Sequence, residues 1–277
     1  MGLFDSIFRR SRRVTEDVPT TALPEQGRGL TVSVGNVQGV GLREEQEDSF
    51  AILNATDAAA LAREGLLAVV CDGMGGMADG KQASETAVAL LCQSFRERQP
   101  EAAVPRWFRE SVHAVSNGVY QQFSGRSGTT LAAVHIHENA LHWVSVGDSA
   151  IYLCRSGGVF QLNREHTFLN RLYARELAED IICRERAEQD EDARRLTAFV
   201  GMDHLEEVDG SLRPLPLQPG DVLLLCSDGI SGVLTPPELL EAMGLEPGQG
   251  CALLETLVLE KQVPEQDNYT GIMISCK

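Results

Sequence analysis

The sequence predicts an α+β fold in which antiparallel strands form the central layers and helices cover them. From Leu30 onward, short strand-like runs predominate, and tight turns rather than helices separate many of them. The helical segments are grouped between blocks of strands, whereas a parallel sheet needs a crossover connection after nearly every strand. The chain has 277 residues, 43% of them hydrophobic, which suffices for a large buried core.

The expected strands are short and mostly apolar. Residues 31–38 alternate as a half-buried strand does, whereas SFAIL, LLAVVC and VLLLCS are typical of buried strands. Residues 128–163 predict successive hairpins that turn at Glu138-Asn139, Gly147-Asp148 and Ser156-Gly157-Gly158. A closing strand is expected over residues 269–276.

Helical periodicity marks two long segments and several shorter ones. Residues 81–97 and 104–123 place apolar side chains at helical spacing and are expected to cover one sheet. Residues 167–195 are helix-like but far more acidic, and residues 236–243 and 251–260 supply a last pair.

The composition argues against several classes of function. A formal net charge of -16 disfavours binding to nucleic-acid phosphates. The seven cysteines contain no CxxC pair, so we expect a reducing cytosol, with no disulfide framework and no zinc site. No apolar run reaches the length of about 18 residues that a membrane-spanning helix needs.

Residues 1–28 differ from the rest and are expected to form a mobile leader before one domain at residues 29–277. The head MGLFDSIFRRSRRV combines one apolar helical face with four arginines, and Gly2 and Ser6 match an N-myristoylation pattern. Residues 1–14 therefore suggest docking to an anionic membrane or to a partner protein, with a plain disordered leader as the alternative.

Carboxylates stand at one end of several expected strands. Asp72 ends the run LLAVVC, and Asp228 follows VLLLCS. These strands are too apolar to be edges, so both carboxylates are expected at the rim of a core, where an unpaired charge is costly. The other acids in such positions are Asp48 before SFAIL, Asp148 after HWVSVG and Asp267 before YTGIMIS.

Divalent cations would neutralise such a cluster. All-oxygen ligands select Mg²⁺ or Mn²⁺, and less often Ca²⁺, rather than zinc. Two such ions about 3.5–4 Å apart can share a bridging water, lower its pKa and hold the oxygens of an in-line phosphoryl transfer. Gly73, Gly75 and Gly76 would let backbone carbonyls and a substrate approach closely.

A competing interpretation comes from GGMADGKQ, which matches the GxxxxGK of a nucleotide-binding P-loop. Gln82 replaces the hydroxyl that would hold Mg²⁺, and Asp79 would point a negative charge at the phosphates. The hairpin-rich chain also lacks the parallel sheet that a P-loop requires, so this alternative is disfavoured.

Six motifs in order resemble the PP2C-type (PPM) family of metal-dependent protein phosphatases. They are GLREEQEDSF, VVCDGMGGMADGKQAS, SGTTL, VGDSAIYL, LLLCSDGI and DNYTGIMI, within about residues 30–277. The resemblance implies an antiparallel two-sheet β-sandwich flanked by helices (α-β-β-α), with metals in a cleft at one end of the sheets. Residues 165–200 match the variable flap beside that cleft.

The resemblance also assigns metal ligands. Asp72 corresponds to the carboxylate that bridges both metals, and the Gly73 carbonyl corresponds to a further ligand. Asp228 and Asp267 resemble the acids that complete one metal, whereas Asp48 resembles the acid on the other.

Three further residues follow from the same comparison. Glu47 corresponds to a ligand or to a residue just behind the ligands. Asp148 matches the acid that, with Asp228, can hold a third, weaker metal. Arg43 matches the arginine that binds the substrate phosphate, a role that suits its planar guanidinium.

The chain departs from the family pattern at three positions. Met74 replaces a histidine that is a candidate leaving-group acid in many eukaryotic members, which leaves protonation to metal-bound water. Gln46 stands where Asn is common, and Ala150 replaces a frequent Arg and is expected to loosen packing around Asp148. The histidines of the expected hairpins and of the following loop are predicted to be structural; they are His135, His137, His142 and His166.

These observations predict a cytoplasmic, bacterial-type phosphatase that hydrolyses phosphoserine and phosphothreonine in proteins. The resemblance implies direct attack by a water that bridges two Mg²⁺ or Mn²⁺ ions, without a phosphoenzyme. We expect a monomer whose partners are phosphoproteins and an opposing kinase, with no nucleic acid. The remaining alternatives are a phosphatase-like binding module without turnover and the P-loop protein.

Overall fold

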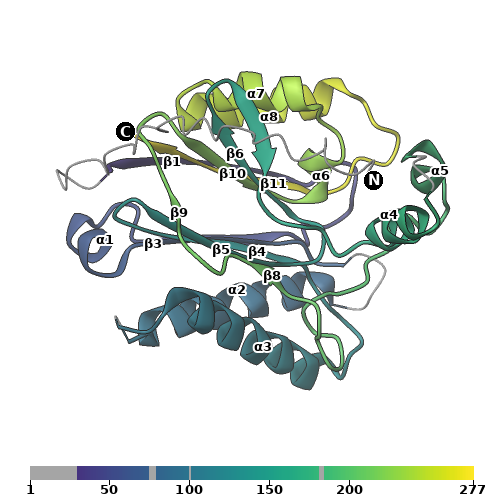
Figure 1. Cartoon of the computed structure of the whole chain (residues 1–277), viewed down its shortest axis with the longest axis horizontal. Helices are drawn as coiled ribbons and strands as arrows, with labels where there is room; N and C mark the ends of the chain where they lie inside the picture. Colours follow the sequence, from purple (N-terminus) through teal and green to yellow (C-terminus); the bar gives the residue numbers. More distant parts are fainter. Residues whose placement is uncertain (1–29, 75–78, 100, 181–183) are drawn as a thin grey trace, which may run out of the picture.

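A computed structural model describes residues 30–74, 79–99, 101–180 and 184–277. Two antiparallel sheets stack on each other, and helices cover both outer faces (Figure 1), so the predicted α-β-β-α sandwich is confirmed. The leader and the docking head predicted for residues 1–28 lie outside the described residues.

The first sheet has five strands in the order β1-β11-β10-β6-β7. Their bounds are β1 Val32–Gly39, β11 Tyr269–Cys276, β10 Val222–Cys226, β6 Ala150–Arg155 and β7 Gly158–Gln161. Helices α7 (Pro236–Met243) and α8 (Pro247–Glu260) pack on its outer face, and the single turn α6 (Asp228–Ser231) follows β10 directly.

The second sheet has the order β2-β3-β4-β5-β8, with β9 paired to β5 as well. Its strands are β2 Ser49–Leu53, β3 Leu66–Cys71, β4 Leu131–His137, β5 Ala140–Val146, β8 Asp209–Gly210 and β9 Leu215–Pro216. Helices α2 (Gly80–Glu97) and α3 (Val104–Phe123) cover it, as predicted, and α1 (Ala58–Glu64) connects β2 to β3.

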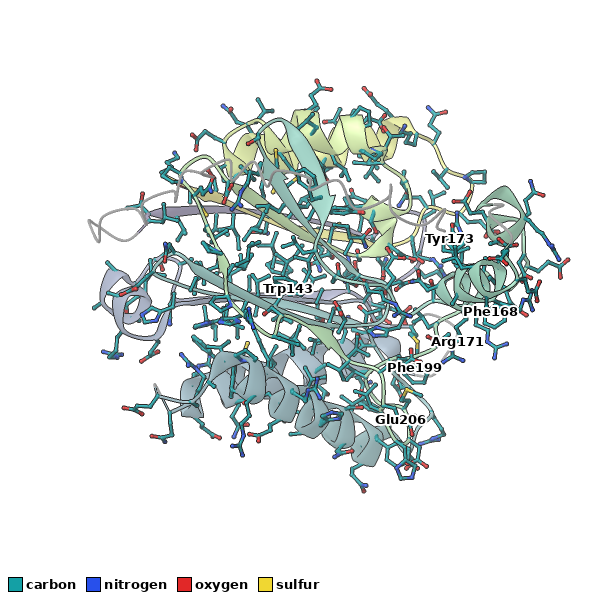
Figure 2. The ribbon with its side chains drawn as sticks, in the orientation of Figure 1. Trp143, Phe168, Arg171, Tyr173, Phe199 and Glu206 are labelled. Atoms are coloured by element: carbon teal, nitrogen blue, oxygen red, sulfur yellow. The ribbon has the colours of Figure 1, made fainter. Side chains whose placement is uncertain are left out.

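The apolar central strands are explained by burial on both faces. In β3, Leu66, Ala68 and Val70 face the other sheet, while the alternating residues face α2 and α3. In β10, Leu223 and Leu225 likewise enter the core between the sheets, and the alternating residues face the covering helices. Figure 2 places Trp143 in that central layer.

One predicted hairpin is wrong. The turn at Gly147-Asp148 does not join two paired strands, because β5 belongs to the second sheet and β6 to the first. Gly147 has φ +96°, and a Cβ there would lie 2.7 Å from Thr130 Cγ2, so glycine lets the chain turn sharply from one sheet to the other. The turns after Glu138 and Ser156 do form hairpins, β4–β5 and β6–β7.

The acidic segment 167–195 forms two short helices rather than one long one. They are α4 (Phe168–Ala178) and α5 (Arg184–Glu188), and both lie at the end of the sandwich where α6 is found (Figure 1). Arg171 of α4 forms an ion pair with Glu207 at 3.0 Å. Figure 2 shows Arg171 next to the segment that carries Phe199 and Glu206, so α4 is anchored to the body of the domain. Within the part of the chain that is described, no helix has the length and apolar character needed to cross a membrane.

Candidate metal centre

Strand register brings the predicted acids to one end of the sandwich. Ser49 pairs with Cys71 in the antiparallel β2–β3 ladder, so Asp48 before β2 and Asp72 after β3 are neighbours. In the other sheet Cys226 pairs with both Gly271 and Ala150. The acids just beyond these pairs are therefore at the same end, and they are Asp148, Asp228 and Asp267.

The electrostatics show that these five carboxylates share one region. Burial raises the pKa of Asp72 well above its usual range, and repulsion from Asp48, Asp228, Asp148 and Asp267 adds to that effect. Burial also raises the pKa of Asp48 to about 6 and that of Asp148 to about 7, in each case with a contribution from the charge of Asp228. The structure thus assembles the cluster that the strand ends predicted.

The donor set fits a hard divalent cation. Asp48 is only 4% exposed, and its Oδ1 and the Oδ1 of Asp228 are buried without a hydrogen-bond partner. Asp228 is among the charges whose repulsion raises the pKa of Asp72, so these two carboxylates are close enough to destabilise each other when both are ionised. Among the described residues, no lysine or arginine forms a salt bridge with Asp48, Asp72, Asp148 or Asp228. Unpaired carboxylate oxygens of this kind are the ligands that Mg²⁺ and Mn²⁺ prefer.

The cluster is nevertheless more open than a finished coordination shell. Within the described ranges, no group of three or more His, Cys, Asp or Glu side chains is arranged as a complete metal site. A bound cation would offset the mutual repulsion of these carboxylates.

The Asp48 side chain is buried, and the hydroxyl of Ser227 holds it. Ser227 Oγ donates to Asp48 Oδ2 at 2.8 Å. Ser227 Oγ in turn accepts from the Thr270 N–H at 2.9 Å. The sequence interpretation missed both residues, although Ser227 lies in LLLCSDGI and Thr270 in DNYTGIMI.

Glu47 and Arg43 sit on a loop that Asn268 fixes. Asn268 Oδ1 accepts from the Glu47 N–H at 2.7 Å, and its Nδ2 donates to the carbonyls of Val40 and Glu45 at 2.9 and 3.1 Å. Burial raises the pKa of Glu47, while the charge of Arg43 lowers it. Arg43 Nη2 lies 2.7 Å from Asp267 Oδ2, so this arginine is at the cluster but is bound to one of its acids.

The backbone at Asp72 is held by the SGTTL motif. The Asp72 N–H donates to Thr130 Oγ1 at 2.9 Å, and its carbonyl accepts from Thr129 Oγ1 and from the Thr130 N–H, both at 2.8 Å. Gly73 follows in a space where a Cβ would collide with the carbonyl oxygens of Glu47 and Gly80. These contacts fix the position of Asp72 independently of its side chain.

Asp148 lies where the chain passes between the sheets. The Gly147 N–H donates to His166 Nδ1 at 3.1 Å, and Ala150, which replaces the family's frequent arginine, is fully buried in the layer under α7. The remaining histidines also bond within the fold: His135 to the Glu64 carbonyl, His137 to the Ala62 carbonyl and His142 to the Ser211 hydroxyl.

A cleft of about 450 Å³ opens beside the cluster, between α6 and the flap. Three aspartates of the cluster line it, namely Asp148, Asp228 and Asp267, and the flap contributes Thr167, Leu169, Ala193 and Arg194 to the lining. Arg194 was not singled out in the sequence because nothing in its spacing distinguishes it from the charged residues around it. The cleft gives an anionic substrate access to these three carboxylates and to any cation they hold.

The sequence of this chain is similar to those of known proteins. The family model described as "Protein phosphatase 2C" matches residues 45–250. A putative protein phosphatase of Mycoplasma pneumoniae is 29% identical over 225 residues, which cover 76% of this chain and 85% of that protein. The serine/threonine phosphatase stp of Listeria monocytogenes is 29% identical over 185 residues, or 64% of this chain and 71% of the relative.

Solved structures extend the similarity to the fold. The crystal structure of the Mycobacterium tuberculosis serine/threonine phosphatase PstP/Ppp superposes with a TM-score of 0.72 and 27% identity, covering 88% of this chain and 98% of that one. The PstP catalytic domain in complex with two manganese ions gives a TM-score of 0.70 at 27% identity, with 89% and 99% of the chains covered.

Proposed function

This chain belongs to the protein phosphatase 2C family of metal-dependent serine/threonine phosphatases, and we propose that its five clustered aspartates form the catalytic metal centre. The observation that carries this assignment is the pair of buried, unpartnered Oδ1 atoms of Asp48 and Asp228 within a group of mutually repelling carboxylates. The P-loop alternative has no support, because the strand ladders of the described residues are antiparallel throughout.

The cofactor is Mn²⁺ or Mg²⁺. When bound, two such ions supply an activated water and neutralise charge on the phosphoryl group. In our proposal Asp72 contributes to both ion positions with the Gly73 carbonyl, while Asp228 and Asp267 serve one ion and Asp48 the other. Glu47 would either bind an ion itself or contact a residue that does. Asp148, next to Asp228, is assigned to a third ion.

The remaining residues of the site orient these groups and the substrate. Ser227 orients the Asp48 carboxylate and is itself held by the Thr270 N–H, and Asn268 holds the loop that carries Glu47 and Arg43. The Arg43 guanidinium matches the geometry of a phosphoryl group and would exchange its contact with Asp267 for that anion. Met74 cannot supply a proton, so the chain offers no titratable side chain at that position.

Hydrolysis of p-nitrophenyl phosphate with and without Mn²⁺ tests the function directly. We expect turnover that depends on Mn²⁺ or Mg²⁺ and disappears when a chelator is added. Absence of turnover at saturating Mn²⁺ in a folded protein would favour a binding module, and tight magnesium-dependent ATP binding would favour a nucleotide-binding protein.

The partners follow from the same assignment. We propose that the protein acts in the cytoplasm as a monomer on phosphorylated proteins and opposes a serine/threonine kinase. The flap at residues 165–200 supports this, because it forms a wall of the cleft next to the acid cluster, where it would contact a protein substrate.

Peripheral docking through residues 1–14 stays a prediction. Deletion of residues 1–14 is expected to leave hydrolysis of p-nitrophenyl phosphate unchanged, since the described domain contains all of the proposed ligands. Co-sedimentation with anionic vesicles, or with a cellular partner, should be lost in the same variant. A full-length protein that associates with neither would show that the segment is a plain leader.

A further inference from the structure

The flap contributes an arginine to the lining of the cleft beside the acid cluster. Among the described residues that line the cleft, Arg194 is the one lysine or arginine. The acidic residues of the lining are Asp148, Glu165, Asp228, Glu265 and Asp267. Arg194 therefore shares one cleft with three aspartates of the cluster.

Arg194 differs from the neighbouring arginines because it forms no ion pair with another described residue. Within the described part of the chain, it forms neither a salt bridge nor a side-chain hydrogen bond. Arg195 approaches Asp192 at 3.8 Å, and Arg171 binds Glu207 at 3.0 Å. Arg43 is bound to Asp267.

The backbone on both sides of Arg194 is fixed to the start of α4. The Ala193 carbonyl accepts from the Leu169 N–H, and the Arg195 carbonyl accepts from the Phe168 N–H, both at 2.8 Å. The Ala193 side chain is 3% exposed and packs in a small core with Leu172. Arg194 is thus an exposed side chain on an anchored backbone, which lowers the entropic cost of holding a ligand.

We propose that Arg194 binds the phosphoryl group of the substrate from the flap side of the cleft. This inference rests on the proposed phosphatase function. A phosphoryl dianion that enters a cleft lined by carboxylates needs cationic donors, and a guanidinium offers several in a geometry that matches phosphate oxygens. An unpaired arginine at the wall meets this need without first breaking an ion pair.

The experiment compares Arg194→Ala with Arg195→Ala, a matched control on the same backbone segment whose side chain is not part of the cleft lining. Steady-state kinetics at saturating Mn²⁺ would use p-nitrophenyl phosphate and a phosphothreonine peptide, with inorganic phosphate as a competitive inhibitor. We expect Arg194→Ala to raise KM for both substrates, and Ki for phosphate, by about tenfold or more, with a smaller change in kcat. Arg194→Lys should recover part of the loss, and Arg195→Ala should behave as the parent protein.

Three results would overturn the proposal. One is an unchanged KM and Ki in Arg194→Ala. A second is an effect confined to the phosphopeptide, which would move the contact to the flanking peptide. The third is a change in the Mn²⁺ concentration required with no change in phosphate affinity, which would make Arg194 a partner of Asp228. A parent protein without Mn²⁺-dependent turnover would instead refute the phosphatase assignment, so the two failures are distinguishable.

Discussion

Replacement of Asp72 by asparagine is expected to lower turnover of p-nitrophenyl phosphate on the order of 10³-fold or more while the protein stays folded. Asp72 is the carboxylate that all four other aspartates repel, so it occupies the centre of the cluster. Asparagine has nearly the same shape, and the backbone contacts to Thr129 and Thr130 remain. The measurement is kcat at saturating Mn²⁺, together with the melting temperature.

Asp148→Asn provides the comparison for that variant. Asp148 lies beside Asp228 but on the crossing between the sheets, so its loss should mainly increase the Mn²⁺ concentration needed for full activity. A titration of activity against Mn²⁺ would show this shift. Near-normal turnover of Asp72→Asn in excess Mn²⁺ would contradict the assignment of Asp72 as the shared ligand.

Much of the site could be predicted because antiparallel register is a strong constraint. Once LLAVVC and SFAIL are paired as buried neighbours, Asp72 and Asp48 must lie together, whatever the details of the loops. The same reasoning applies to Asp228 and Asp267 at the ends of β10 and β11. Burial on both faces gives these strands their uninterrupted apolar character, and the acids mark where that burial ends.

Features that depend on tertiary contacts could not be predicted in this way. A glycine followed by aspartate after a strand is typical of a hairpin, and only packing against Thr130 and the hydrogen bond to His166 reveal that Gly147 leads into the other sheet. Hydroxyl and amide side chains also show no characteristic sequence spacing when their hydrogen-bond partners are far away in the sequence. Asn268, for instance, fixes a loop more than two hundred residues away in the sequence.

The cation-free protein is expected to lose stability as the pH rises from about 4 to about 7. The pKa of Asp48 is raised from 3.8 to about 6 and that of Asp148 to about 7, chiefly by burial. Below the pKa that these carboxyl groups have in the unfolded chain, both groups are protonated in the folded and in the unfolded state. Their raised pKa values then have no effect on the stability. As the pH rises through that value, the unfolded chain releases protons that the folded cluster retains, so folding becomes less favourable until the folded pKa is passed. Shifts of this size correspond to roughly 3 kcal/mol for Asp48 and roughly 4 kcal/mol for Asp148, a large share of a typical folding free energy of about 5–15 kcal/mol.

Urea denaturation of chelator-treated protein between pH 4.5 and 7.5 would measure this loss. Asp148→Asn should reduce the pH dependence and raise stability at pH 7, because the amide has no proton to release on unfolding. Glu138 lies in the exposed turn between β4 and β5, so Glu138→Gln should change neither the pH dependence nor the stability at pH 7. Saturating Mn²⁺ should restore stability near neutral pH, since cation binding to the ionised cluster in the folded state opposes unfolding. A cation-free protein that becomes more stable between pH 5 and 7, or an Asp148→Asn variant that matches the parent at pH 7, would show that these carboxylates are not held together against their repulsion.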